Sequence, residues 1–311
     1  MHATPAAKLE NPSQETRYTR RARYFNSGNA FAIKHPAVPR HIFLAERDRA
    51  FAAETGTGLI GLDLSEVLEL AYPATTPLIL ARYARIREGD SLSTAFRSSG
   101  EIYHVIRGRG KTGGPDDSLE WKAGDTIFLP GGRKWTHSAM EDVVLYVVTN
   151  EPQLAFEGLE PPRDGHDGTN GTMEPVLYPG ERIEAELEAI HKDPAAGEMA
   201  GYAVIFSSES MEDIRNIHPT MTLAMNSLPA GMIQRPHRHN SAAVTLLLDS
   251  EGGYSITEGQ RIDWSRHAVM VTPPGAVHSH YNEGPALNRF LIVQDGGLYY
   301  HCRTMGFSYE P

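Results

Sequence analysis

Residues 231–240, GMIQRPHRHN, and residues 273–282, PPGAVHSHYN, decide the fold of this chain. His237 and His239 are two positions apart, and side chains two apart on a strand share a face, so both imidazoles point to one side. His278 follows 39 residues after His239 and comes directly after a tight turn expected at 273–275. A neighbouring strand of a small barrel would bring this imidazole to the same face. Three neutral imidazoles there leave open coordination positions, as in a catalytic metal site.

The composition of the 311 residues restricts the classes of partner and metal. Hydrophobic residues make up 40% and charged residues 22%, which is typical of a globular protein. A net charge of -10 argues against nucleic acid and anionic lipid as partners. Cys302 is the only cysteine beside 14 histidines, so a metal must be bound mainly through nitrogen or oxygen. The sequence shows no leader-like or membrane-spanning apolar stretch, and we expect a cytoplasmic protein.

The pattern along the chain predicts a mainly β protein with four parts. Residues 1–76 read as an arm with short helices, and residues 77–157 contain short apolar runs separated by turn residues, such as EIYHVIRG and VVLYVVTNE. Residues 158–195 combine a polar linker, including PPRDGHDGTNGT, with an amphipathic helix at 181–192. Residues 196–311 return to the strand pattern. Such runs are typical of an antiparallel sandwich or barrel.

The two strand-rich halves can be superimposed, and their motifs resemble those of the cupin superfamily. The second half has Gly-x5-His-x-His from Gly231, followed by Pro-x-Gly-x2-His-x3-Asn from Pro273, with His267 where a glycine is usual. The first half keeps the turn residues and Glu101 but carries other residues at the three histidine positions, namely Ala95, Arg97 and Trp135. The resemblance implies two tandem cupin domains, which are jelly-roll β-barrels, with the metal in the second only.

Within that superfamily the chain is similar to the gentisate and salicylate 1,2-dioxygenase group. The similarity rests on the tandem arrangement, the His-Arg-His triplet at 237–239, the His-x-His tail at 278–280, and the stretch LYPGERIEAELEAI before the second barrel. The glutamate of the first cupin motif is replaced here by Ala243 or Val244, which argues against the four-ligand cupins. Two features depart from the group: the metal site lies in the second barrel, and Thr245 stands where an arginine is usual.

The resemblance implies an Fe(II)-dependent, extradiol-type dioxygenase that opens the ring of a hydroxylated aromatic acid with O2. Gentisate, salicylate and substituted salicylates such as 5-nitrosalicylate are the expected substrates. His237, His239 and His278 are the expected ligands, although ligand type alone also permits Mn, Ni, Zn or Cu. His280 comes two positions after His278, so both side chains should face the same side of the strand. The group this chain resembles uses the corresponding histidine near the metal. We therefore expect His280 to act as the catalytic residue that transfers a proton.

The substrate-binding residues are less defined by the sequence. Thr245 stands where the group has an arginine, so one expected anchor for the substrate carboxylate is missing. Arg235 comes two positions before His237 and would face the same side of the strand, although Pro236 disturbs the strand there. Arg289, together with Gln294 and Asp295 near the end of its strand, is a further candidate.

Two alternatives remain open at this point. One is a hydroquinone-type ring-cleaving dioxygenase, and the other is a non-redox metal cupin, either an isomerase or lyase or a small-molecule binding protein. An alternating apolar run at 221–225, with Val269 and Val271, would suit an apolar cavity lining, but any barrel core needs such alternation. We expect a homo-oligomer, either a dimer or a tetramer. The basic arm and the metal-free first barrel are available surfaces, and the related two-barrel proteins usually form homo-oligomers.

Overall fold

The structure is a computed structural model that describes residues 16–114, 118–161, 173–193 and 201–310. The chain forms two compact units, residues 1–36 and residues 37–311. The described part of the first unit holds the 3-10 turn η2 (Thr19–Arg21), and five of its large apolar side chains are exposed: Tyr18, Tyr24, Phe25, Phe31 and Ile33. No helix among the described residues is long and apolar enough to cross a membrane.

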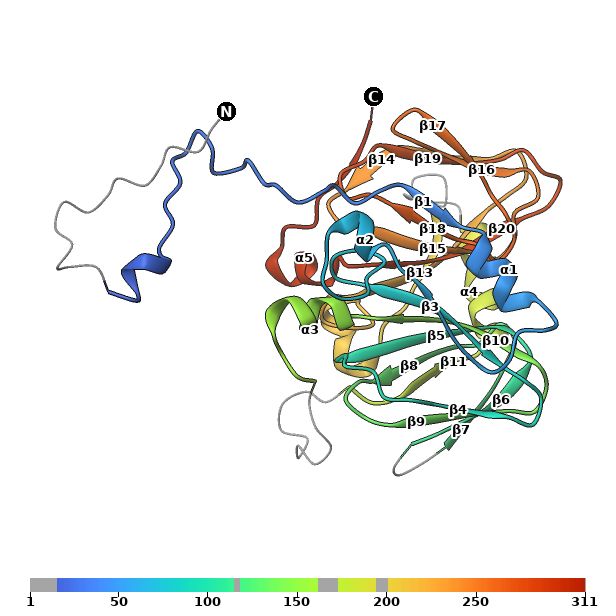
Figure 1. Cartoon of the computed structure of the whole chain (residues 1–311). Coiled ribbons are helices and arrows are strands. Elements are labelled where there is room, and N and C mark those ends of the chain that lie inside the picture. The colour runs from blue at the N-terminus through green and yellow to red at the C-terminus, as the bar shows by residue number, and fades with distance from the viewer. Residues whose placement is uncertain (1–15, 115–117, 162–172, 194–200, 311) are drawn as a thin grey trace. The chain divides into compact units, whose positions relative to one another are not determined.

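The second unit contains two antiparallel β-barrels, each built from two sheets (Figure 1). The N-terminal barrel combines a sheet of order β11-β8-β5-β10-β3-β2 with a sheet of order β4-β9-β6-β7. Its strands are β2 (Gly58–Leu62), β3 (Leu80–Ile86), β4 (Ser91–Thr94), β5 (Gly100–Arg107), β6 (Arg109–Gly113), β7 (Ser118–Lys122), β8 (Thr126–Pro130), β9 (Trp135–Ala139), β10 (Val143–Thr149) and β11 (Val176–Tyr178).

The C-terminal barrel repeats this plan with a sheet of order β1-β18-β15-β20-β13-β12 and a sheet of order β17-β16-β19-β14-β21. Its strands are β1 (His41–Phe43), β12 (Tyr202–Ile205), β13 (Thr222–Leu228), β14 (Ile233–His239), β15 (Ala243–Leu247), β16 (Gly253–Thr257), β17 (Gln260–Asp263), β18 (Val269–Thr272), β19 (His278–Asn282), β20 (Asn288–Gln294) and β21 (Phe307–Tyr309).

Helices are few and short in the described residues. Besides η2 they are α1 (Ala45–Phe51), α2 (Ser65–Leu68), α3 (Glu151–Glu157), α4 (Gly180–Lys192), the 3-10 helix η4 (Glu209–Ile214) and α5 (Gly297–Cys302). The amphipathic helix predicted at 181–192 is confirmed as α4, which buries Ile183 and Leu187. The prediction of a mainly β protein made of antiparallel barrels is therefore confirmed.

The central strands of the two six-stranded sheets are buried on both faces. Strands β10 and β15 are buried along their whole length, because one face lines a barrel and the other joins a shared core. That core draws Tyr83 and Tyr146 from one barrel and Met221 and Leu291 from the other. Strands buried on both faces read as continuous apolar runs rather than as alternating patterns. This explains sequences such as VVLYVVT in β10.

Three short strands come from segments outside the two predicted barrel ranges. Within 1–76 the structure has the expected short helices, and it adds β1 to the C-terminal barrel and β2 to the N-terminal one. Within 158–195, β11 pairs with β8 of the N-terminal barrel. Each strand covers a sheet edge whose backbone groups would otherwise lack partners. Parts of the predicted arm, linker and C-terminal domain, residues 1–15, 162–172 and 194–200, lie outside the described residues.

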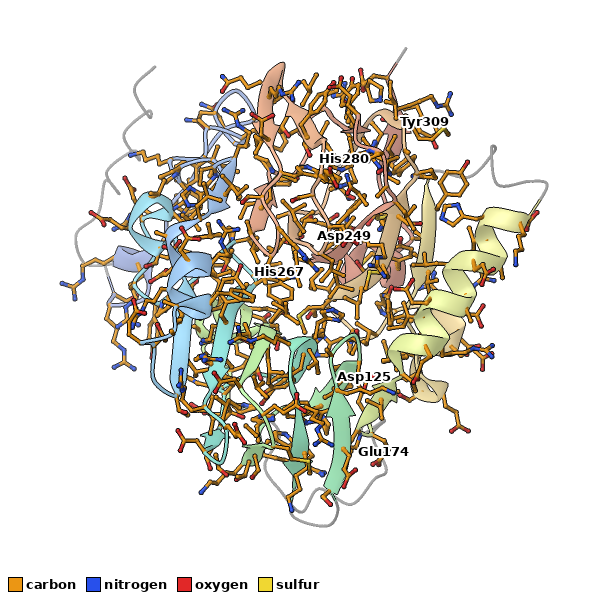
Figure 2. The ribbon with its side chains drawn as sticks, turned by 90° about the vertical axis from the view of Figure 1, so that its right-hand side faces the viewer. Asp125, Glu174, Asp249, His267, His280 and Tyr309 are labelled. Atoms are coloured by element: carbon orange, nitrogen blue, oxygen red, sulfur yellow. The ribbon has the colours of Figure 1, made fainter. Side chains whose placement is uncertain are left out.

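His267 lies between the two barrels (Figure 2). It adopts the left-handed conformation with φ +62°, which explains why a glycine would suit this position. Its ring stacks on Phe51 with the centroids 4.9 Å apart, and its carbonyl accepts a hydrogen bond from Tyr83 Oη of the N-terminal barrel. The left-handed conformation of His267 thus occurs at a position that contacts the N-terminal barrel.

Candidate metal centre

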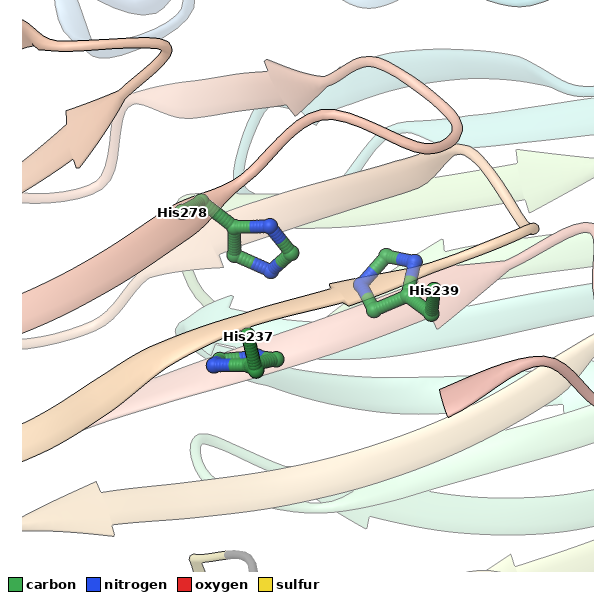
Figure 3. Close-up of side chains that lie close together, drawn as sticks. All are labelled: His237, His239 and His278. Carbon is green, nitrogen blue, oxygen red and sulfur yellow. The ribbon is translucent and has the colours of Figure 1, made fainter. Parts of the chain in front are cut away.

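The three histidines predicted as ligands converge at one point inside the C-terminal barrel. His237 and His239 project from β14, and His278 projects from the paired strand β19, directly opposite His237 (Figure 3). One ligand atom from each ring lies within 4.8 Å of the other two. All three side chains are buried, with the His237 and His278 ring centroids 4.2 Å apart. Among the described residues this is the only cluster of three or more such side chains that could hold a metal ion.

Backbone carbonyls fix which nitrogen of each ring faces the centre. The Nδ1 atom of His237 lies 2.7 Å from Arg235 O, that of His239 lies 2.8 Å from Ser241 O, and that of His278 lies 2.9 Å from Ala276 O. A carbonyl oxygen only accepts, so each Nδ1 carries the imidazole proton and each Nε2 presents a lone pair. These hydrogen bonds from the far side of the ring are those that orient histidine ligands in metal sites.

Burial keeps the three rings neutral. It lowers the pKa of His239 to about 4 and that of His278 to about 3, and it lowers the pKa of His237 as well. Proximity of the other rings lowers the pKa of His278 further. Neutral imidazoles with converging lone pairs are the form that binds a divalent cation. The donor set therefore fits a metal with three nitrogen ligands and open positions.

A cavity of about 310 Å³ adjoins the three rings. This volume is at the small end of the roughly 300–1,000 Å³ usual for ligand pockets, so it suits one small ring. Amide and hydroxyl side chains form the polar part of its wall, and no aspartate or glutamate occurs among the described residues that line it. The polar residues of the wall, apart from histidine and arginine, are Asn216, Thr222, Asn226, Gln234, Thr245, Thr272, Gln294 and Tyr300.

His280 lines the same cavity from inside the C-terminal barrel (Figure 2). Its Nδ1 atom lies 2.8 Å from Ser255 Oγ, which also accepts a hydrogen bond of 2.8 Å from Trp264 Nε1. Burial, and then the neighbouring imidazoles, hold its pKa well below the ordinary value of 6.5. At neutral pH His280 is therefore an uncharged hydrogen-bonding group.

The candidate substrate residues occupy different places. Thr245 is buried and lines the cavity. Arg235 is not part of the wall, because its guanidinium lies outside the barrel, 4.2 Å from the centre of the Tyr309 ring. The pairing of β14 with β19 shifts between Gln234 and His237, where three steps along β14 oppose two along β19. This one extra residue reverses the expected parity and places Gln234 in the wall instead.

Arg289 is also directed away from the cavity. Its guanidinium binds Asp249 Oδ2 at 2.7 Å and Glu184 Oε1 at 2.5 Å. Gln294 does line the cavity, and its amide nitrogen lies 3.1 Å from His239 Nε2. Asp295 lies outside the wall, where it accepts a hydrogen bond from the Ala242 backbone and where burial raises its pKa to about 7.

The apolar alternation before the ligands faces the other way from the cavity. Met221, Met225, Val269 and Val271 lie in the core shared by the two barrels, whereas the intervening Thr222, Ala224 and Asn226 line the cavity. Leu223 belongs to the shared core and also reaches the wall. The expectation of an apolar lining from this run is wrong for most of its residues, because the sheet is covered on both faces and the apolar side chains of this run face the core between the barrels. Ala243, rather than Val244, is the residue in the wall at the missing glutamate position.

Several residues of the wall have no signal in the sequence. Gln234 and Arg215 line the cavity, and Met305 and Phe307 reach it from the C-terminal segment, where β21 pairs with the ligand strand β14. The Phe307 ring lies 5.3 Å from that of His237. A three-residue strand and an arginine in a loop carry no periodic signal, so only tertiary contacts reveal them.

The described residues of the N-terminal barrel include no comparable set of ligands. The pairing of Thr94 with Trp135 corresponds to the pairing of His237 with His278, so Trp135 stands where a ligand would be. Ala95 and Arg97 do not face the interior: Arg97 is exposed and paired with Glu160, and the buried Phe96 lies between them. The bulge in β14 has no counterpart in β4, which explains why spacing alone aligned the wrong pair.

Comparisons with known proteins agree with this architecture. No protein-family model matches the chain. Salicylate 1,2-dioxygenase from Pseudaminobacter salicylatoxidans has a similar structure, with a TM-score of 0.72, 13% identity, and coverage of 90% of this chain and 91% of that one. The same enzyme in its adduct with gentisate gives a TM-score of 0.71, 14% identity, and coverage of 91% and 89%.

The similarity in sequence is more local. A gentisate 1,2-dioxygenase from Ralstonia sp. is 33% identical over 82 residues, which are 26% of this chain and 23% of that protein. The chain thus matches less than a quarter of the length of this curated relative. The chain has the two-barrel cupin fold of the salicylate 1,2-dioxygenases and resembles a gentisate 1,2-dioxygenase in part of its sequence.

Proposed function

We propose that this protein is an Fe(II)-dependent dioxygenase that opens the ring of a hydroxylated aromatic acid such as gentisate, salicylate or 5-nitrosalicylate. The observation that carries the proposal is the set of three neutral imidazoles beside a cavity of about 310 Å³ whose described wall has no carboxylate. Three nitrogen ligands leave positions for two substrate oxygens and for dioxygen. A single aromatic ring matches the size of the cavity.

Fe(II) bound there would supply the one-electron chemistry that lets ground-state dioxygen react with an aromatic ring. The chain itself contributes the orientation of the ligands. His237, His239 and His278 each donate from Nδ1 to a carbonyl, so the rings do not have to reorient when a metal binds. Phe307 and Ile292 in the wall reduce the access of water to the reacting groups.

His280 has the role of a hydrogen-bonding partner and proton acceptor for the substrate hydroxyl. Trp264 can only donate, so it occupies one lone pair of Ser255 Oγ and leaves the other lone pair for Nδ1–H of His280. In that arrangement Nε2 of His280 presents a lone pair that can accept the proton. Burial keeps the ring neutral, which suits a group that accepts a proton and returns it.

A non-redox metal cupin is the alternative that experiment must separate. Salicylate and gentisate dioxygenases among the similar proteins, and the absence of a glutamate at Ala243, support the redox proposal. Anaerobic reconstitution with Fe(II), followed by gentisate, salicylate, 5-nitrosalicylate or hydroquinone under air, tests it. We expect one O2 consumed per substrate molecule and a new ultraviolet band from the ring-opened dienoic acid, because both oxygen atoms enter the product. Iron-loaded protein that consumes no oxygen with any of the four would leave only the non-redox function.

We also propose a cytoplasmic homo-oligomer, dimer or tetramer. The exposed aromatic side chains of residues 18–31 support an oligomer, and the free thiol of Cys302 supports a reducing compartment. Sedimentation of the full chain tests the oligomer, and a mass that fits a monomer at micromolar concentration would exclude it.

A further inference from the structure

Among the described residues that line the cavity, one side chain carries a permanent positive charge and none is a carboxylate. Arg215 is the only arginine or lysine among them. A divalent metal on neutral ligands would add two further positive charges. Such a wall attracts anions and disfavours neutral ligands of the same shape.

The backbone at Arg215 is held in place although its side chain is exposed. Arg215 ends the 3-10 helix η4 in the left-handed conformation, with φ +53°, and its N–H donates to Glu212 O at 3.1 Å. The next residue, Asn216, is buried and donates from its amide to Gly297 O at 3.3 Å. Arg215 therefore lines the cavity from an anchored backbone, and none of the ion pairs among the described residues involves it.

Three other arginines of this barrel already have partners outside the cavity. Arg289 binds Asp249 and Glu184, Arg238 binds Glu310, and Arg235 stacks on Tyr309. Each of these guanidinium groups already has an acceptor or an aromatic face. Arg215 has its five donors available to a ligand, and a planar guanidinium matches a carboxylate in a bidentate hydrogen-bonded pair.

We propose that Arg215 binds the ring carboxylate of the substrate and so replaces the anchor that Thr245 cannot provide. The inference rests on the proposed function and deepens it, because it selects aromatic acids over neutral hydroquinones as the substrate class. The phenolic oxygen and one carboxylate oxygen lie toward His237, His239 and His278, and the other carboxylate oxygen lies toward Arg215. Arg215 is a specificity-determining residue on this account.

Binding in the absence of oxygen tests the proposal without turnover. Calorimetry on the Fe(II)-loaded full chain under nitrogen measures the dissociation constants of gentisate and of hydroquinone, which lacks only the carboxylate. The variants are Arg215→Gln and Arg215→Lys. Arg303→Gln is the matched control, because Arg303 also ends a short helix in the left-handed conformation, with φ +58°, but does not line the cavity.

We expect Arg215→Gln to weaken the binding of gentisate about 10- to 100-fold, which is the usual effect of losing a hydrogen bond to a charged group. Hydroquinone should bind with unchanged affinity, Arg215→Lys should recover part of the loss, and Arg303→Gln should match the wild type. Equal gentisate affinity in Arg215→Gln and wild type would overturn the role of Arg215 and leave the proposed function intact. A wild-type protein that loads iron but binds none of gentisate, salicylate, 5-nitrosalicylate and hydroquinone would overturn the proposed function, and the role of Arg215 with it.

Discussion

The two barrels share a plan but differ in what fills them. In the N-terminal barrel 13 buried apolar residues, including Phe96, Trp121 and Trp135, form the interior cluster. The corresponding cluster of the C-terminal barrel has only five, including Trp264 and Phe290, and the remaining space holds the histidines and the cavity. One barrel uses its interior for stability, and the other gives up apolar packing for a site. Packing of a sheet from each barrel against the other lets the first support the second.

A second comparison shows which polar residues belong to the barrel itself. In the N-terminal barrel Trp121 Nε1 donates to Thr112 Oγ1, which contacts His137 Nδ1, both at 2.8 Å. The C-terminal barrel repeats this trio with Trp264, Ser255 and His280, again at 2.8 Å. The separation is 143 residues throughout: 112 to 255, 121 to 264 and 137 to 280. The trio therefore holds a strand pair in both barrels, and only the neighbouring ligands can give His280 a chemical role.

The largest effect is expected from removing a ligand. His278→Ala should lower the affinity for Fe(II) at least about 100-fold and abolish oxygen uptake, because two imidazoles remain for a site built for three. Trp135→Phe changes the equivalent position of the N-terminal barrel and should leave iron binding unchanged. Elemental analysis after dialysis measures both. Full iron content in His278→Ala would mean that the three histidines do not hold the iron.

A smaller effect should distinguish the two trios. His280→Gln should lower kcat about 100-fold with the iron content intact, since a positioned proton acceptor contributes roughly that factor. His137→Gln, its counterpart, should leave kcat unchanged. Both variants lose a buried imidazole, so both should lose about 1–2 kcal/mol of unfolding free energy. Equal kcat values in the two variants would assign His280 a purely architectural role.

The last prediction concerns stability alone and Glu101, the cupin glutamate retained in the N-terminal barrel. Its side chain is fully buried and accepts a hydrogen bond from Tyr103 Oη, and its Oε1 has no hydrogen-bond partner among the described residues. Burial raises the pKa of Glu101 to about 8. Because the folded state then holds a proton that the unfolded state releases near pH 4.5, Glu101 lowers stability as the pH rises between these two values.

Glu101→Gln mimics the protonated acid and should remove this dependence. The variant should match the wild type near pH 5 and exceed it by about 1 kcal/mol for each pH unit above that, up to about pH 8. Urea unfolding at a series of pH values measures the difference. A constant difference across this range would mean that Glu101 is ionised in the folded protein.

Much of the fold and part of the site followed from the sequence because they depend on local periodicity. Side chains two apart on a strand share a face, which was enough to group His237 with His239, and the Pro-Gly turn before His278 set the return strand. The same rule failed for Arg235, because the bulge before His237 reverses the parity. It also failed for Met221 and Met225, which lie on the outer face of a sheet that is buried on both sides.

The residues that the sequence did not reveal come from tertiary contacts. Arg215 reaches the cavity from the end of a 3-10 helix, and Phe307 reaches it through a three-residue strand that pairs with β14. Neither segment has a repeat, a motif or a preferred spacing to the ligands. Their positions depend on the packing of the whole barrel.

Anomalous diffraction at the iron edge, from crystals of the protein reconstituted anaerobically with Fe(II), tests the central claim most directly. The account predicts one peak per chain, within bonding distance of Nε2 of His237, His239 and His278, and no peak in the N-terminal barrel. Iron bound elsewhere on the chain, or no peak in protein that retains its fold, would contradict it.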